Sequence, residues 1–297
     1  MIVSASYKTD IPALYGRWFR ARLAAGSCRM RNPYGGQVYD LPLTPGSVDG
    51  FVFWTRNAVP FSDALDEVAA RGFPFTVQYS ITGYGRRLEP SVPRTEAMIE
   101  AVRALARRWG PRAVVWRYDP VLISSDTPVS FHAGNFAAIA RALGGASDEV
   151  VVSFAHVYRK TARNLDALKD EFSWTDPLLA DKTDLVARLA VLAGDYGLRL
   201  TVCSQADIVA VAHGPARCID ADRLSDVAGR AITAPVKGNR PGCLCHAARD
   251  IGDYDTCPHG CAYCYAVSNR ARGRAGHARH DPTAAALVPP APVAAAH

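Results

Sequence analysis

The stretch Phe51-Val-Phe-Trp-Thr-Arg56, followed by the amphipathic run Ser62–Arg71, is the local pattern that decides the fold. Short β-branched and aromatic runs alternate with amphipathic stretches along the whole chain, which is typical of βα units around a parallel sheet. We expect strands near residues 1–6, 51–56, 74–81, 113–118, 149–155 and 198–203, and helices near residues 11–25, 62–71, 94–109, 131–143, 181–196 and 220–229.

Six such units predict an α/β fold, a partial (βα)6 TIM-like barrel over residues 1–234, and leave a doubly wound sheet as the alternative. Residues 28–43, with Asn32-Pro-Tyr-Gly-Gly36 at their centre, predict an inserted β-hairpin. Residues 235–268 are rich in Gly, Cys and Pro and predict a cysteine-rich iron–sulfur segment packed on the barrel. The Arg/Gly and Ala/Pro composition of residues 269–297 predicts a disordered tail.

Composition narrows the class of protein. The chain has 297 residues, 49% of them hydrophobic, which is enough for one large buried core. It has no apolar run of membrane-spanning length and no recognisable signal peptide, so we expect a cytoplasmic protein with no membrane partner. In that compartment its eight cysteines indicate metal binding rather than disulfides. Residues 270–297 hold about half of the net charge of +6, so charge supports a nucleic-acid partner only weakly.

The most informative motif is Cys257-Pro-His-Gly-Cys261-Ala-Tyr-Cys264, a C-x3-C-x2-C pattern. This spacing suits three corners of a 4Fe–4S cluster, and it leaves the fourth iron open to the amine and carboxylate of S-adenosylmethionine (SAM). Tyr263, next to the third cysteine, would shield the cluster from water. The alternatives are a structural zinc site, which usually repeats C-x2-C pairs, and an ordinary electron-transfer cluster.

The chain resembles an uncharacterised bacterial domain-of-unknown-function family whose C-terminal cysteine cluster is similar to the N-terminal cluster of radical-SAM enzymes. The resemblance covers residues 2–268. It is carried by the stretches Ser4–Ala13, Val52–Asn57, Trp116–Pro120 and Asp250–Ala266. It implies a 4Fe–4S cluster, SAM as cofactor and the partial barrel common in radical-SAM enzymes. It leaves the substrate open, because the family has no settled reaction.

Polar residues recur where predicted strands end, which is where a βα barrel places its active site. Arg117 and Asp119 share one face of their strand and would bind opposite ends of a zwitterionic or ribose-bearing ligand. The alternative is a buried ion pair, with Lys8 or Asp10 on a neighbouring strand as further partners. Asp10 also suits the N-cap of the first helix. The candidate catalytic residues are Lys8, Asp10, Arg117 and Asp119.

Three further residues at strand ends, Arg56, Asn57 and Ser80, are candidates for binding the cofactor, together with Tyr263. Arg56 and Asn57 would contact the substrate or the methionine carboxylate of SAM. The Gly-Gly-Glu-type strand end that holds the SAM amine in many radical-SAM enzymes is not evident in this sequence. The contacts to SAM therefore cannot be assigned from that motif.

Four other cysteines, Cys203, Cys218, Cys243 and Cys245, match the number of ligands of a second 4Fe–4S cluster or of a structural zinc ion. One alternative is that Cys203 and Cys218 are small core residues. Another is that Cys243 or Cys245 is the fourth ligand of the first cluster, which would exclude SAM. Cys28, in the predicted hairpin, has no expected ligand role.

The hypothesis is therefore a radical-SAM-type enzyme that reductively cleaves SAM and generates a 5′-deoxyadenosyl radical, which acts on an unknown small molecule in the barrel mouth. Its electron would come from a donor such as ferredoxin or flavodoxin. One alternative is a nucleic-acid repair or modification enzyme, because the motif resembles that of spore photoproduct lyase. The other is a non-catalytic module that binds iron–sulfur clusters or zinc.

Overall fold

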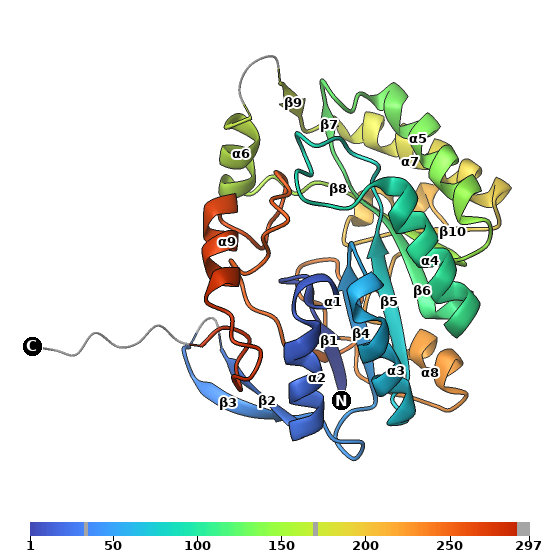
Figure 1. The fold of residues 1–297 in the computed structure, drawn as a ribbon. Helices are drawn as coiled ribbons and strands as arrows, with labels where there is room; N and C mark the ends of the chain where they lie inside the picture. The colour runs from blue at the N-terminus through green and yellow to red at the C-terminus, as the bar shows by residue number, and fades with distance from the viewer. Residues whose placement is uncertain (33–34, 169–171, 290–297) are drawn as a thin grey trace, which may run out of the picture.

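The computed structural model describes residues 1–32, 35–168 and 172–289. At its centre is a seven-stranded sheet whose paired neighbours all run parallel (Figure 1). In spatial order from one edge to the other, the strands are β11 (Ala248–Asp250), β1 (Ile2–Ala5), β4 (Gly50–Thr55), β5 (Phe75–Ser80), β6 (Val114–Val121), β8 (Glu149–Phe154) and β10 (Arg199–Val202).

Helices connect these strands in the βα pattern that the sequence predicts. The α-helices of the described residues are α1 (Ile11–Leu14), α2 (Gly16–Ala25), α3 (Ser62–Ala70), α4 (Thr95–Trp109), α5 (Val129–Leu143), α6 (Arg159–Asp166), α7 (Leu179–Asp195), α8 (Ala221–Ala228) and α9 (Arg270–Ala278). Short 3-10 helices span Val59–Phe61, Pro111–Ala113 and Ala206–Val211. Two small antiparallel pairs lie outside the sheet, β2 (Ser27–Arg31) with β3 (Val38–Pro42) and β7 (Ile123–Ser124) with β9 (Trp174–Thr175).

The sheet is buried on both faces, so its strands are almost continuously apolar. Alternate residues of the strands, such as Phe51, Phe53 and Trp116, pack into the main core with helices α2 to α5 and α7. The intervening residues, such as Val52 and Val115, face a smaller core that contains α8 and the cysteine-rich loops. The cysteine-rich loops therefore complete one side of the sheet.

Consecutive strands of the chain lie side by side from β1 to β10, with no reversal of the kind found in a doubly wound sheet. A closed barrel is not present, because β10 and β11 are the two edges of an open sheet. The prediction of six βα units also left out one strand of the sheet. β11 joins the sheet beside β1, so residues 235–268 contribute to the sheet rather than only packing on it.

The predicted disordered tail is wrong for the described part of residues 269–297. Helix α9 begins after Asn269, whose side chain caps its N-terminus by accepting from the Arg272 amide. Beyond the helix, Trp18 and Arg22 donate side-chain hydrogen bonds to the carbonyl oxygens of Ala284 and Thr283, and Leu287 is buried in the main core. Specific docking therefore orders a segment whose composition alone favours disorder. Residues 290–297 lie outside the described part.

Candidate functional site

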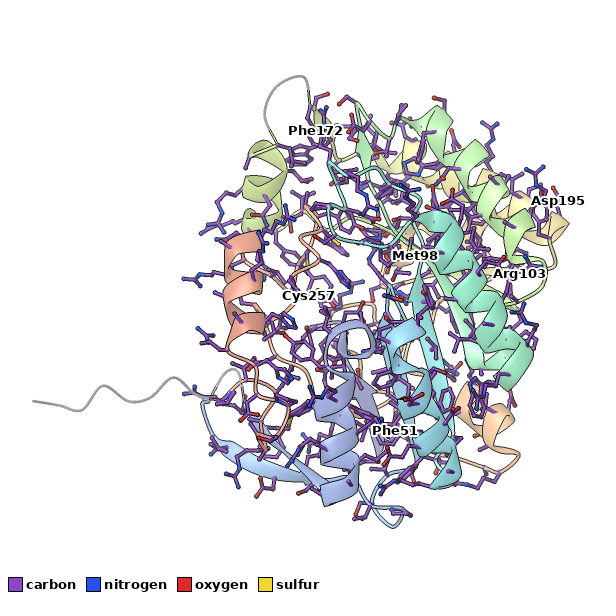
Figure 2. The ribbon with its side chains drawn as sticks, in the orientation of Figure 1. Phe51, Met98, Arg103, Phe172, Asp195 and Cys257 are labelled. Carbon is purple, nitrogen blue, oxygen red and sulfur yellow. The ribbon has the colours of Figure 1, made fainter. Side chains whose placement is uncertain are left out.

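The C-x3-C-x2-C motif follows β11 and lies over the carboxyl ends of the neighbouring strands. Figure 2 shows Cys257 between α9 and the sheet. Asp250, the last residue of β11, fixes the turn into this segment by accepting hydrogen bonds from Ser4 Oγ at 2.8 Å, Ser6 Oγ at 2.7 Å and the Tyr7 amide at 3.0 Å. A Cβ at Gly252 would lie 2.0 Å from Ser6 Oγ, so only glycine permits this close approach.

Cys257, Cys261 and Cys264 are brought together, and none of them forms a disulfide. Burial raises the pKa of all three thiols, to about 12 for Cys261. The charges of Cys264 and Cys261 add to the shift of Cys257, and that of Cys264 adds to the shift of Cys261. The Cys264 amide donates to the Cys261 carbonyl at 3.1 Å. The three half-buried cysteines thus share one site.

Asp10 is a structural residue of this site. Its Oδ1 caps α1 by accepting from the Ala13 amide at 2.9 Å, and Oδ2 accepts from the Arg56 amide at 2.8 Å. Oδ2 also lies 2.9 Å from Nε2 of His259, inside the cysteine motif. These contacts confirm the N-cap alternative, and they leave the carboxylate occupied by protein partners. Asp10 therefore attaches the motif to the first βα turn.

Arg56 is the centre of a buried polar network. Its guanidinium donates to Glu89 Oε1 at 2.8 Å and to the Tyr263 hydroxyl at 2.6 Å, and that hydroxyl donates in turn to Glu89. Burial opposes the Arg56 charge, but Glu89 and other neighbours hold its pKa well above the ordinary value. Arg56 and Tyr263, both predicted as cofactor-binding, thus fasten the motif to the ends of β4 and β5.

The side chain of Tyr263 is buried in the protein. Its ring packs edge-on against Tyr84, with centroids 5.9 Å apart, and lies in a small apolar cluster with Leu88 and Ala262. The predicted shielding role concerns only the ring, because the hydroxyl belongs to the polar network. Glu89, which sequence reasoning left out of the site, is the carboxylate that makes this arrangement electrostatically stable.

Arg117 and Asp119 form an ion pair with each other on β6, which confirms the buried-pair alternative for these residues. The predicted further partners, Lys8 and Asp10, are not in it. Asp119 also accepts from Ser153, and the Arg117 guanidinium lies 5.0 Å over the Trp54 ring. Both side chains are therefore saturated by protein groups.

Lys8 lies beside the cysteine motif rather than beside Arg117. Its ammonium is 3.5 Å from Asp250 Oδ1 and 5.6 Å from the ring centroid of Tyr254. Lys160, which sequence reasoning missed, also lies 5.6 Å from Tyr254, and its charge lowers the pKa of Cys264 against the effect of burial. The four residues predicted as one catalytic group are thus divided between two places.

Asn57 and Ser80 lie at the edges of the site. Asn57 lines a surface cavity of about 380 Å³ together with Ser91, His259 and Arg274. Its side chain also accepts from the Val59 amide at 3.2 Å, which stabilises the turn after β4. Ser80 ends β5 beside Arg117 in the sheet register. Neither residue contacts a motif cysteine in the described structure.

Cys203, Cys218, Cys243 and Cys245 form a second group on the other face of the sheet. Cys218 Sγ lies 3.6 Å from Cys203 Sγ, and Cys245 is close enough to both Cys218 and Cys243 to shift the pKa of each thiol. The prediction that these cysteines converge is therefore supported. They do not join the first motif, because the neighbours of the motif thiols are Asp10, Arg56 and Lys160.

Neither cysteine group, as the structure describes it, is arranged to hold a single metal ion. In the arrangement seen, the described residues contain no group of three or more His, Cys, Asp or Glu side chains that could hold a metal ion. A cubane makes a different demand, because each of its thiolates binds a separate iron. Cys28 belongs to the hairpin strand β2 and is buried in the core, outside both groups.

Three contacts escaped sequence reasoning, those of Glu89, His259 and Asp250. Asp250 and His259 lie within the cysteine-rich segment, so their position in the sequence indicated that they belong to the site. The partner of each depends on which distant strands become neighbours. Within the part of the chain that the structure describes, no helix is both long and apolar enough to cross a membrane.

Comparison with known proteins identifies a family for this chain but no activity. No curated protein matches the chain. The model of a family described as a domain of unknown function, DUF1848, matches residues 2–266. The match spans every strand of the sheet and both cysteine groups and ends before α9. This chain is therefore a member of the DUF1848 family.

Proposed function

We propose that this protein is an iron–sulfur enzyme of the radical-SAM type. Cys257, Cys261 and Cys264 would hold a 4Fe–4S cluster, with SAM bound beside it and an unknown small molecule as substrate. When bound, the cluster would supply the electron for reductive cleavage of SAM, after reduction by a donor such as ferredoxin or flavodoxin. The observation that carries the proposal is the placement of three half-buried, free thiols at the carboxyl end of the sheet, close enough for Cys261 and Cys264 to influence Cys257.

The topology removes the main objection, which is that radical-SAM enzymes usually carry these cysteines after their first strand. In this chain the motif comes last in sequence, but it follows β11, which is the first strand in space. β11 pairs in parallel with β1, from Ile2 opposite Ala248 to Ser4 opposite Asp250. Read from that edge, the sheet supports a permuted partial barrel with the cysteines after its first strand.

The residues present fit a cluster with one open iron. The three thiols are free and influence one another electrostatically, which suits ligands of three different irons of one cluster. No fourth cysteine is among the groups that influence them. Arg56 is close enough to Cys261 to lower its pKa, and Lys160 does the same for Cys264. These cations favour the thiolates that metal binding requires.

The surrounding side chains have distinct tasks in this proposal. Arg56, Glu89 and Tyr263 hold the motif against β4 and β5, and Asp10 holds His259. Lys160, whose ammonium faces Tyr254 near Cys264, is the group that we expect to receive the methionine carboxylate of SAM. Arg117 and Asp119 would shape the mouth of the site rather than react.

The direct test is SAM cleavage by anaerobically reconstituted protein. After dithionite reduction we expect the release of methionine and 5′-deoxyadenosine, with about four irons per chain at this site. The Lys160→Met variant should keep its iron and bind SAM more weakly, while Lys182→Met, which removes a lysine paired with Asp176, serves as the matched control. Full cluster loading without any SAM cleavage would overturn the proposal.

A further inference from the structure

The second cysteine group joins parts of the chain that are far apart in sequence. Cys203 follows β10, Cys218 lies in the loop before α8, and Cys243 and Cys245 precede β11. Cys203 and Cys218 are in direct contact, Cys245 influences the pKa of Cys218, and Cys245 in turn influences that of Cys243. The group lies on the face of the sheet, where Gln78 of β5 donates to the Cys218 carbonyl at 3.0 Å and Arg117 of β6 donates to Cys218 Sγ at 2.9 Å.

We propose that these four cysteines bind one zinc-type ion, a site independent of the radical-SAM function proposed above. The spacing of the sulfurs argues for a single ion. Four sulfurs placed tetrahedrally about 2.3 Å from one zinc ion are about 3.8 Å apart. Cys203 Sγ and Cys218 Sγ are 3.6 Å apart. A cubane would place each sulfur on its own iron and separate them more widely.

Three of the sulfurs accept hydrogen bonds from N–H groups of the protein. Arg117 Nη1 donates to Cys218 Sγ at 2.9 Å, and Arg240 Nη2 donates to Cys203 Sγ at 3.5 Å. The Ile219 amide donates to Cys245 Sγ at 3.4 Å. Such N–H groups stabilise metal-bound thiolates and orient them. A divalent ion with four thiolates carries two negative charges, which Arg240 and Arg117 face, the latter also paired with Asp119.

The backbone around the Cys-x-Cys pair is closely packed. A Cβ at Gly238 would lie 2.2 Å from the Cys243 carbonyl oxygen, so the preceding loop crosses this pair at short range. The Lys237 amide donates to the Cys245 carbonyl at 2.8 Å, and the His246 amide donates to Ile219 at 2.9 Å. The pair is thus held beside the Cys218 loop by main-chain contacts as well as by thiols.

In the structure the four thiols form a chain of contacts rather than a closed ring, in line with the lack of a ready single-ion group among the described residues. Loss of the thiol protons and approach of Cys243 to Cys203 would close the ring. Metal binding would then be coupled to ordering of the loop between them. The ion would tie the β10 edge to the segment that leads into β11.

Metal analysis of protein purified without added iron tests this site. We expect about one zinc per chain in the wild type and in the Cys257→Ala/Cys261→Ala/Cys264→Ala variant, and less than about a fifth of that in Cys218→Ser. Cys28→Ser, which removes another buried cysteine, is the matched control and should keep its zinc. Zinc retained in Cys218→Ser, or no zinc in the wild type, would overturn the proposal.

A second measurement needs no variant. Cobalt(II) added to metal-depleted wild-type protein should give the intense thiolate-to-cobalt absorption and the visible bands of a tetrahedral four-sulfur site. About eight irons per chain after anaerobic reconstitution, with four of them lost in Cys218→Ser, would show a second 4Fe–4S cluster and contradict the zinc assignment. Loss of SAM cleavage in the triple variant, with its zinc intact, would separate the two sites.

Discussion

The two cysteine groups lie on one sheet, but they differ in the spacing of their sulfurs. Cys218 Sγ and Cys203 Sγ are 3.6 Å apart, whereas the hydrogen bond that links Cys264 to Cys261 is a main-chain bond from amide to carbonyl at 3.1 Å. The second cysteine group faces two arginines directly, and the C-x3-C-x2-C motif is held by the shell of Arg56, Glu89 and Tyr263. The comparison indicates that the spacing of the sulfurs, more than the number of cysteines, distinguishes a single-ion site from a cluster site.

The largest expected effect separates the two groups by their metals. Cys261→Ala should reduce cluster iron from about four per chain to nearly zero and abolish SAM cleavage, since the cubane loses one of only three protein ligands. Zinc should stay unchanged, because Cys261 does not contact the other group. Iron and zinc are measured together by plasma spectrometry. Loss of both metals in a folded variant would show that the groups are one site.

The next effect concerns the shell of the motif. Arg56→Met leaves Glu89 buried without its cation, and we expect a loss of about 3–5 kcal/mol in the free energy of unfolding, measured with urea on metal-free protein. Arg20→Met, which breaks an exposed pair with Glu67, should cost less than about 1 kcal/mol. Equal losses in the two variants would contradict the assignment of Arg56 as the centre of the network.

Helix α9 offers a third test, because it packs directly on the motif backbone. A Cβ at Gly273 would lie 2.3 Å from the Cys257 carbonyl oxygen, so Gly273→Ala should cost about 1–3 kcal/mol and weaken iron retention. Gly134→Ala, in α5, meets open space and should stabilise by about 0.5–1 kcal/mol. A neutral effect of Gly273→Ala on both iron and stability would place α9 away from the motif.

The smallest effect sharpens the role of Tyr263. Tyr263→Phe keeps the ring against Tyr84 but removes the hydroxyl that bridges Arg56 and Glu89. We expect a loss of about 1–3 kcal/mol in unfolding free energy with the iron content preserved. If iron is lost in this variant while the protein remains folded, the hydroxyl itself positions the cysteines.

Much of the fold was predictable because its elements carry strong local patterns. The strand predicted at residues 51–56 is β4, and the hairpin predicted at residues 28–43 corresponds to β2 and β3. β11 was missed, since Ala248-Arg249-Asp250 has no apolar run and forms a strand only because β1 offers an open edge. Helix α9 was missed for a related reason, because its Arg/Gly sequence is stabilised by docking on the motif.

The site was predictable only as a list of residue types. Spacing in the sequence identified the three motif cysteines, and number identified the other four. The sequence could not identify the hydrogen-bond and ion-pair partners of these residues, because the partners depend on which strands are adjacent. Arg117 pairs with Asp119 on its own strand, while Lys8 pairs with Asp250 from the far end of the chain. Sequence distance hid the second pair and made the first look like a ligand site.

The central claim is that one iron of the cluster held by Cys257, Cys261 and Cys264 is open to SAM. The most direct measurement is the EPR spectrum of the reduced, anaerobically reconstituted protein with and without SAM. The account predicts a 4Fe–4S signal whose g-values shift when SAM is added, and the same shift in Cys218→Ser. A spectrum that SAM leaves unchanged at full cluster occupancy would contradict it.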